Sequence, residues 1–354
     1  MKRKIIIFSI LVIIVFLISL LISLRYFEKK YDIKIIEIKE KVEKEKKQDD
    51  EFTIKLSFAG DTMLASLKGY NTPGSFVDYA EKQEPTYFLE KVSKIFKEDD
   101  FTILNLENVL TDQELPEVVK NTDPAYWYKS KASNINILSS SSVEGVSVSN
   151  NHTSDYGPRG KEDTINAIKN ANMQYGDYNN IMYFEKNNYI VAVICKGLWI
   201  ETQTSEIIKL IKEAEEKSDY QIVFFHGGTE RIHYPEEWKI RATRKLIDNG
   251  AELVVGSHPH VIQPREIYQG KEIVYSLGNF CYGGNRAPEN RTIIYQMNIT
   301  IDKKTNTIIK EESKIIPCYV YTGSTNNYQP APIEDEKIKN KVIDFMNWQV
   351  NSPV

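Results

Sequence analysis

The chain has 354 residues, enough for one large domain or two small ones, and its 41% hydrophobic and 27% charged residues are ordinary for a globular protein. Its formal net charge of −4, without a basic stripe outside the termini, argues against nucleic acid as a partner. The three cysteines are widely spaced, which excludes a zinc cage built from cysteines and argues against a disulfide framework.

The N-terminus predicts a membrane anchor. Residues 5–24 carry no charge, and a helix of that length spans a hydrocarbon core of about 30 Å. Lys2, Arg3 and Lys4 lie before it, which favours a cytoplasmic location for residues 1–4. Because no small-residue cleavage site follows, we expect an uncleaved, single-pass signal anchor in the cell membrane, with the C-terminal domain extracellular. A cleaved secretory signal is the alternative.

Residues 25–51 predict a charged helical stalk. Tyr31, Ile35, Ile38 and Val42 recur at helical spacing among lysines and acidic residues. This stripe is shorter than three heptads, so we favour a solvated helical spacer over a coiled-coil dimer.

From residue 52 onward, strand-like and helix-like segments alternate. The strand-like segments are short β-branched or aromatic runs that end in turn residues: Thr53–Ala59, Phe101–Leu106, Val143–Ser149, Tyr189–Cys195, Gln221–Phe225, Glu252–Gly256 and Glu272–Ser276. The helix-like segments are Tyr87–Lys97, Lys161–Asn172, Ser205–Lys217 and Glu236–Asn249. The alternation predicts a layered α/β domain over residues 52–325, followed by a C-terminal tail and helix over residues 326–354.

Polar residues that could bind a metal follow several of the predicted strands. They include four of the five histidines and two carboxylates: Asp61, Glu107, His152, His226, His258 and His260. In an open α/β sheet the loops at the carboxyl ends of the strands converge on one crevice, so these side chains could meet. Such mixed ligands suit Mn, Fe or Zn.

Most of these residues also have a purely structural interpretation. Asp61 could cap a helix or form a turn, and Glu107 could belong to a salt bridge. His226 alone could be an ordinary buried histidine. The turn from His258 to His260 is the most specific signal, because two imidazoles on a rigid turn can face one or two cations.

The loop that begins at Asn150 adds a possible acid catalyst. An asparagine side-chain oxygen can bind a metal, while the adjacent His152 can donate a proton to a leaving group. Asp155 could orient that imidazole. A polar turn is the structural alternative. His233 is the least informative histidine, either lining the cleft or simply exposed.

The order of these segments resembles the CapA family of poly-γ-glutamate or capsule synthesis proteins, within the calcineurin-like metallophosphoesterase superfamily. The matching motifs are Gly60-Asp61-Thr62-Met63-Leu64, Asn105-Leu106-Glu107, Ser149-Asn150-Asn151-His152 with Asp155-Tyr156-Gly157, His226-Gly227-Gly228 with Glu230, Gly256-Ser257-His258-Pro259-His260-Val261, and Tyr275-Ser276-Leu277-Gly278-Asn279-Phe280. The resemblance covers most of the predicted extracellular part, from Thr53 to Tyr319.

This resemblance implies a metallophosphoesterase-like four-layer α/β sandwich that binds one or two divalent transition-metal ions (Mn, Fe or Zn). The implied site consists of three groups: the metal ligands Asp61, Glu107, Asn151, His226, His258 and His260, the catalytic residues His152 and Asp155, and the substrate-binding residues Asn150, Glu230 and Asn279. It also implies an anionic envelope polymer, first of all poly-γ-glutamate, and polymer synthesis and export subunits as partners.

The sequence departs from the wider phosphoesterase pattern at three positions. Met63 and Glu107 stand where those enzymes carry a histidine ligand and a bridging aspartate, and both changes are typical of the CapA branch. Gly227 replaces the family's usual tryptophan; Trp127 could provide an aromatic surface instead, or pack in the core. Because Met63 cannot supply the nitrogen ligand of that histidine, the sequence argues against full phosphodiesterase activity.

We therefore expect a membrane-anchored protein that makes, exports or processes an anionic capsule polymer, with a metal-dependent hydrolase-type site. One alternative is a non-catalytic, metal-stabilised scaffold or polymer-binding subunit. Another is a generic surface metallophosphodiesterase.

Overall fold

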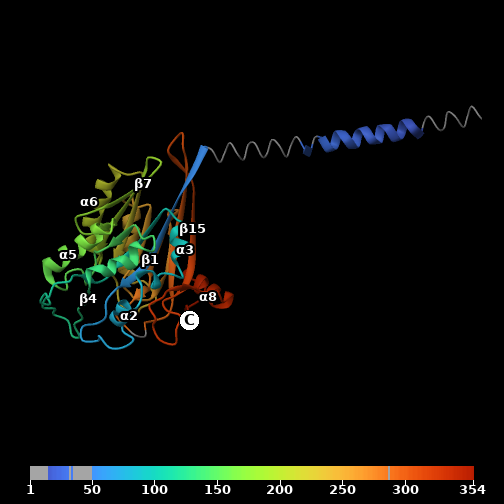
Figure 1. Cartoon of the computed structure of the whole chain (residues 1–354). Coiled ribbons are helices and arrows are strands. Elements are labelled where there is room, and N and C mark those ends of the chain that lie inside the picture. Colours follow the sequence, from blue (N-terminus) through green and yellow to red (C-terminus); the bar gives the residue numbers. More distant parts are fainter. Residues whose placement is uncertain (1–14, 32, 35–49, 286–287) are drawn as a thin grey trace, which may run out of the picture. The chain divides into compact units, whose positions relative to one another are not determined.

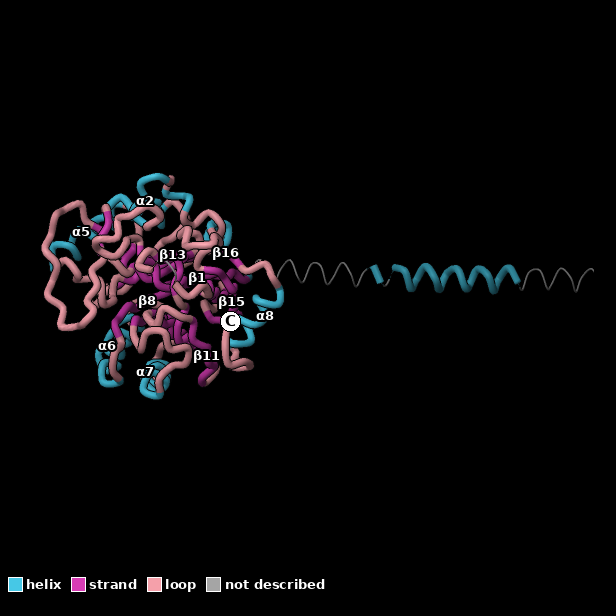
Figure 2. The backbone as a smooth tube through the Cα atoms, turned by 90° about the horizontal axis from the view of Figure 1, so that it is seen from below, coloured by secondary structure: helices cyan, strands magenta, loops and turns pink. Residues whose placement is uncertain are grey.

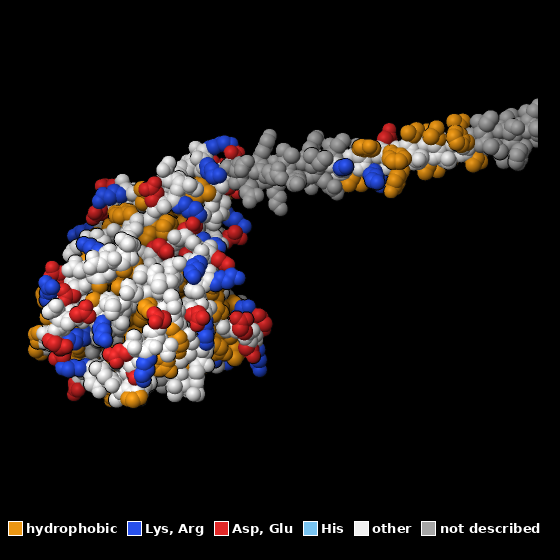
Figure 3. Space-filling view, in the orientation of Figure 1, with side chains coloured by type: hydrophobic (Ala, Val, Ile, Leu, Met, Phe, Trp, Pro, Cys, Tyr) orange, Lys and Arg blue, Asp and Glu red, His pale blue; other side chains and the backbone are white. Residues whose placement is uncertain are grey.

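The computed structural model describes residues 15–31, 33–34, 50–285 and 288–354. The chain divides into two compact units, one formed by Met1–Thr53 with Thr300–Ile309 and the other by Ile54–Ile299 with Lys310–Val354. In the first unit, residues 15–31 form a helix with exposed hydrophobic side chains (Figure 3). Within the described residues no helix is long and apolar enough to cross a membrane. Residues 5–14 of the predicted anchor and most of the predicted stalk lie outside the described residues.

Two β-sheets form the core of the second unit, and residues 51–53, 300–302 and 307–309 of the larger sheet belong to the first unit. The larger sheet has the strand order β16-β15-β14-β1-β2-β5-β6, and β13 also pairs with β1. Its strands are β1 (Glu51–Met63), β2 (Phe101–Leu106), β5 (Gly145–Ser147), β6 (Gln174–Gly176), β13 (Asn279–Tyr282), β14 (Thr292–Asp302), β15 (Thr307–Tyr319) and β16 (Ala331–Pro332). Because β1, β2, β5 and β6 are parallel neighbours, their carboxyl ends lie along one edge.

The smaller sheet repeats this arrangement, with the strand order β11-β12-β10-β9-β8-β7. Its strands are β7 (Met182–Lys186), β8 (Tyr189–Gly197), β9 (Tyr220–His226), β10 (Leu253–Ser257), β11 (Ile262–Tyr268) and β12 (Lys271–Leu277). Here β8, β9, β10 and β12 are parallel neighbours. A separate ladder pairs β3 (Val109–Leu110) with β4 (Lys129–Ser130).

Helices cover the outer face of each sheet (Figures 1 and 2). The helical segments are α2 (Phe76–Lys82), η1 (Pro85–Tyr87), α3 (Ser93–Lys97), η2 (Ala132–Ile135), α4 (Asn136–Ser139), α5 (Gly157–Asn170), η3 (Glu201–Gln203), α6 (Thr204–Glu215), α7 (Glu237–Ile247) and α8 (Glu336–Met346). Apolar residues of α2, α3 and α5 pack with the larger sheet, and those of α6 and α7 pack with the smaller one.

The inner faces of the two sheets pack against each other. Phe58 of β1 and Phe224 of β9 meet edge to face there, with ring centroids 5.8 Å apart. The order of layers is therefore helices, sheet, sheet, helices, and the predicted layered α/β architecture is confirmed. This packing brings the carboxyl ends of strands from both sheets to the same region.

One segment differs from the sequence-based expectations. The predicted helix over Tyr87–Lys97 is wrong in extent, because only Ser93–Lys97 forms an α-helix. Before it, Val92 donates a backbone hydrogen bond to Leu89, three residues back, which is the tighter spacing of a turn. Residues 326–354, predicted as a C-terminal tail and helix, include α8 and belong to the second compact unit, where Tyr328 is fully buried against Phe76.

Candidate metal centre and cleft

The polar residues at the strand ends lie together where the two sheets meet. Asp61, near the end of β1, is in register with Asn105 of β2, and Glu107 follows one residue after β2. On the other sheet, His226 ends β9 and is in register with Ser257, the last residue of β10. Parallel pairing in each sheet, followed by packing of the sheets, assembles this cluster from distant parts of the sequence.

Asp61 is fully buried, and both of its carboxylate oxygens accept hydrogen bonds. Oδ1 accepts one from Asn105 Nδ2 at 2.9 Å, and Oδ2 accepts one from the backbone N of His258 at 3.0 Å. His260 Nδ1 lies 3.3 Å from Oδ2, and His226 Nδ1 lies 3.6 Å from Oδ1. Burial disfavours the charged form, but His260 and then His226 outweigh it and lower the pKa of Asp61. Asp61 is therefore a carboxylate at neutral pH.

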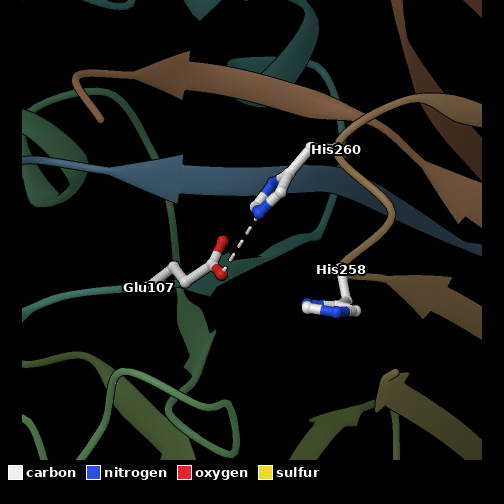
Figure 4. Close-up of side chains that lie close together, drawn as sticks. All are labelled: Glu107, His258 and His260. Carbon is white, nitrogen blue, oxygen red and sulfur yellow. Dashed lines mark ion pairs between the residues drawn. The ribbon is translucent and has the colours of Figure 1, made fainter. Parts of the chain in front are cut away.

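Glu107 is also fully buried, but no described residue donates a hydrogen bond to either of its carboxylate oxygens. The imidazoles of His226 and His260 approach Oε1, with their Nε2 atoms at 3.4 and 3.8 Å. Figure 4 shows His260 pointing toward Glu107, with His258 beside them. Burying a carboxylate without hydrogen bonds costs free energy of folding. A cation bound to these oxygens would offset that cost.

The three histidines surround the two carboxylates. His226 Nε2 lies 3.1 Å from His258 Nδ1 and 2.9 Å from Asn151 Oδ1, both within hydrogen-bond distance. Burial, together with the two neighbouring imidazoles, lowers the pKa of His258 far below its usual value, so its ring is neutral. Burial also opposes charge on His260, but Glu107 and Asp61 outweigh it and raise the pKa of His260 to about 10. A proton on His260 thus supplies part of the positive charge that the carboxylates require.

The turn that carries these histidines has an unusual backbone. His258 has a φ of 99° and His260 a φ of 59°, values that non-glycine residues adopt at a cost of about 1–3 kcal/mol each. The amide hydrogen bond from His258 to Asp61 holds the first residue. For the second, Asn279 Nδ2 donates to His260 O at 3.1 Å and Asn279 Oδ1 lies 3.0 Å from His260 Nδ1. Asn279, predicted to bind substrate, therefore supports His260.

Asn105 was not predicted as a site residue, yet it links three members of the cluster. It donates to Asp61, its Nδ2 lies 3.2 Å from His226 Nδ1, and its Oδ1 accepts from Asn150 Nδ2 at 3.0 Å. Asn150, predicted to bind substrate, also donates to the backbone of Leu106 at 2.8 Å and is buried. Both asparagines therefore connect the strand ends, a role that no local sequence pattern indicates for Asn105.

His152 and Asp155 form a separate pair beside the cluster. His152 Nδ1 lies 2.8 Å from Asp155 Oδ2, which also accepts a hydrogen bond from the backbone N of Tyr128 at 2.9 Å. Lys120, which was not predicted as a site residue, places its ammonium 2.5 Å from Asp155 Oδ1. Because Nδ1 faces Asp155, the opposite ring nitrogen of His152 remains for a ligand in the cleft that His152 lines.

Trp199, which was not predicted as a site residue, packs against two of the histidines. Its ring centroid lies 5.7 Å from that of His226 and 4.8 Å from that of His258. Trp127 is neither in the core nor against the cluster: it is partly exposed, and its indole N–H donates to the carbonyl of Val118. Met63 is fully buried in an apolar cluster with Tyr128 and other residues, as expected for a core methionine.

A cleft of about 690 Å³ opens beside this cluster. His152, His260, Asn279 and Glu230 line it, together with several tyrosines. Glu230 is exposed, and its charge helps to raise the pKa of His260. His233 does not line the cleft, since its ring nitrogens face the carbonyl of Ile262 and the carboxylate of Glu289, each at 3.1 Å.

The donor atoms form two overlapping groups that could each hold a metal ion. One consists of Asp61, Glu107 and His226, and the other of Glu107, His258 and His260. Within each group the donor atoms lie within 4.8 Å of one another. Asn151, through its contact with His226, lies beside the first group. The unsatisfied oxygens of Glu107, which belongs to both groups, fit a bound divalent cation.

Comparison with known proteins gives a consistent family match. The family model "Bacterial capsule synthesis protein PGA_cap" matches residues 55–182 and 175–283. A PGA biosynthesis protein CapA of Bacillus subtilis (strain 168) is 26% identical over 312 residues, covering 81% of this chain and 78% of that protein. A capsule biosynthesis protein CapA of Bacillus anthracis is 25% identical over 283 residues, covering 72% and 66%. A crystal structure of a phosphatase from Mycoplasma pneumoniae aligns with a TM-score of 0.45 at 16% identity, covering 75% of this chain and 94% of that one.

Proposed function

Because the chain belongs to the PGA_cap family of bacterial capsule synthesis proteins, we propose that it acts in the synthesis, export or processing of an anionic envelope polymer. Poly-γ-glutamate is the first candidate, since one similar protein is a PGA biosynthesis protein. Polymer synthesis and export subunits would be its partners. The membrane anchor over residues 5–24, with the domain outside the cell, belongs to the same proposal and is motivated by the uncharged run in the sequence.

The proposed activity is a metal-dependent hydrolysis, and the observation that carries it is the buried carboxylate of Glu107. Its two oxygens lack hydrogen bonds within the described structure, and Oε1 lies 3.4 Å from His226 Nε2 and 3.8 Å from His260 Nε2. Asp61, Glu107, His226, His258 and His260, with Asn151 beside them, would hold one or two Mn, Fe or Zn ions. When bound, such an ion polarises the scissile bond and activates water.

The residues of the chain have separate tasks in this proposal. His152 protonates the leaving group through the ring nitrogen that does not face Asp155. Asp155 fixes the orientation of the ring, and Lys120 keeps Asp155 paired. Asn105 and Asn150 link the end of β2 to Asp61 and to the loop that carries His152, and so fix the distances between them. Trp199 shields one side of His226 and His258 from water.

A gene deletion and a turnover assay test this function together. A deletion strain complemented with the wild-type gene should make capsule polymer of normal amount and length, whereas complementation with His152→Gln should change one or both. The purified chain should cleave an oligomer of γ-linked glutamate when loaded with Mn²⁺. Unchanged polymer in the deletion strain would overturn the proposal. Cleavage of simple aryl phosphodiesters, but not of the oligomer, would favour a generic surface phosphodiesterase.

A second candidate is a non-catalytic scaffold or polymer-binding subunit. One observation favours it: His260 lies beside both carboxylates, with Nδ1 3.3 Å from Asp61 Oδ2 and Nε2 3.8 Å from Glu107 Oε1. A protonated imidazole there would partly neutralise them without a metal. Met63 in the apolar core supports it further, because it offers no nitrogen ligand. If the protein is a scaffold, a deletion strain complemented with His152→Gln should make as much polymer as one complemented with the wild-type gene.

A further inference from the structure

Arg231 brings a positive charge into the cleft. It lines the same cleft as His152 and His260 and is exposed. No ion pair, side-chain hydrogen bond or ring contact joins its guanidinium to another residue in the described part of the chain. Among the other charged residues that line the cleft, Glu289 pairs with His233.

The backbone of Arg231 is strained, and its position is fixed relative to the candidate metal centre. Its φ of 61° lies in the left-handed region that non-glycine residues adopt at a cost of about 1–3 kcal/mol. Its backbone N donates a hydrogen bond of 2.8 Å to the carbonyl of Pro259, the residue between His258 and His260. Strain of this kind concentrates at functional sites. A residue kept there despite the strain, with an unpaired side chain, points to a ligand contact.

We propose that Arg231 binds an anionic group of the ligand, a carboxylate or a phosphate, and so holds the ligand across the cleft beside His152 and His260. The guanidinium group suits this task because its planar fork donates two parallel hydrogen bonds to either group. The inference rests on the proposed function for the identity of the ligand, but the anion contact itself does not depend on hydrolysis.

The neighbouring Glu230 brings the opposite charge to the same cleft. No ion pair joins it to Arg231 or to any other described cation. The cleft is therefore not a general attractor of anions, and binding of an anion there depends on a direct contact with the guanidinium. This makes a neutral substitution of Arg231 a specific test.

Binding to the full-length chain tests the inference. The probes are an oligomer of γ-linked glutamate, the same oligomer with its α-carboxylates amidated, and inorganic phosphate, each measured by titration calorimetry. We expect Arg231→Gln to weaken binding of the carboxylate oligomer about tenfold or more and to leave binding of the amidated oligomer unchanged. Arg231→Lys should lose part of the affinity. Arg241→Gln, which removes an exposed arginine of α7 that pairs with Glu201, is the matched control and should bind as the wild type does.

Arg231→Gly separates ligand binding from folding. Glycine adopts the left-handed conformation without strain, so this variant should melt at the wild-type temperature or above it. It should nevertheless lose the same affinity as Arg231→Gln. If Arg231 serves only the conformation of the loop, Arg231→Gly will keep the wild-type affinity, and the inference is wrong.

The outcomes distinguish this inference from the proposed function. If the wild type binds the carboxylate oligomer and Arg231→Gln binds it equally well, the anion contact is overturned. The proposed function would still stand. Binding of phosphate alone, lost in Arg231→Gln, would keep the contact and count against a polyglutamate ligand. Absence of binding of both anions by the wild type would overturn the contact.

Discussion

His260 Nε2 lies 3.8 Å from Glu107 Oε1, and this contact joins the turn after β10 to the end of β2. Glu107 has no hydrogen bond from any described residue, and the pKa of His260 is raised to about 10. A proton on His260 and a metal ion would therefore compete for the same carboxylates. Metal binding at this site should release protons, as expected wherever a protonated histidine becomes a ligand.

Removal of Asn105 should weaken metal binding without unfolding the protein. Asn105→Ala leaves Asp61 Oδ1 and Asn150 Nδ2 without one of their partners. Loss of such a supporting contact lowers metal affinity by about 10–100-fold. The affinity for Mn²⁺ can be measured by competition with a chelator. Asn134→Ala, which removes one hydrogen bond to Leu64 away from the cluster, should keep the wild-type affinity; equal affinities in both variants would contradict the role of Asn105.

His152→Gln should lower turnover by about 10²–10⁴-fold while metal content stays the same. General acid catalysis contributes about 10²–10⁴-fold to a rate, and this substitution removes the acid but none of the candidate ligands. Cleavage of γ-linked glutamate oligomers and metal content should be measured on the same sample. His233→Gln is the control histidine, since its ring contacts Ile262 and Glu289 instead. A His152→Gln variant with the wild-type rate would remove His152 from the chemistry.

Lys239 should prove important for stability, because its ammonium is fully buried on α7. It donates to Gln263 Oε1 at 3.0 Å and lies 3.2 Å from Glu236 Oε2, and burial lowers its pKa to about 8 although Glu236 opposes this. Gly228, with a φ of +115°, leaves the space for it, since a Cβ there would lie 2.0 Å from Nζ.

Lys239→Met should therefore reduce the free energy of unfolding by roughly 1–3 kcal/mol, because Gln263 and Glu236 lose their buried partner. Urea denaturation at neutral pH would measure this loss. The exposed Lys245, on the same helix, provides the comparison, and Lys245→Met should change stability by no more than about 0.5 kcal/mol. Equal stabilities of the two variants would show that the buried contacts contribute nothing.

Stability should fall as the pH rises from about 4.5 to about 7, because of Glu144. Burial, together with the charge of Asp99, raises the pKa of Glu144 from 4.5 to about 7, despite the hydrogen bond of 2.7 Å from the backbone N of Thr102. In this range the folded state binds more protons than the unfolded state, so each rise in pH favours unfolding. The contribution is on the order of 1–3 kcal/mol.

Glu144→Gln should remove that part of the pH dependence, since glutamine does not titrate and can still accept the hydrogen bond from Thr102. Urea unfolding at several pH values would compare the slopes. The variant Glu185→Gln, at an exposed position of β7, should retain the wild-type slope. A slope that survives in Glu144→Gln would assign the effect to other groups, such as Asp99, whose pKa burial raises to about 6.

The proximity of the strand-end residues could be predicted from the sequence. Asp61, Glu107, His226 and His258 follow apolar runs directly, and parallel strands deliver their carboxyl ends to one edge. The structure places all four in one cluster, although their role as ligands stays a prediction.

Other members of the site could not be predicted, because their contacts depend on tertiary packing. Asn105 lies within a strand, where a polar residue normally faces solvent, and only the pairing of β1 with β2 turns it toward Asp61. Trp199 and Lys120 come from loops whose paths no local pattern determines. The burial of Lys239 could not be predicted either, because it depends on the loop at Gly228, which packs against its ammonium group. The long strands β14 and β15 were also not predicted, but for a different reason: neither is followed by one of the motifs that could bind a metal.

The metal content of the full-length chain tests the central claim most directly. We expect about one or two equivalents of Mn, Fe or Zn in the wild-type protein, depending on whether both donor groups are filled. Glu107→Gln and the double variant His258→Ala/His260→Ala should lose most of this metal while keeping the wild-type circular dichroism spectrum. A folded wild-type protein that binds no metal when Mn²⁺, Fe²⁺ or Zn²⁺ is supplied, or a Glu107→Gln variant that binds as much as the wild type, would contradict the claim that these strand ends form a metal centre.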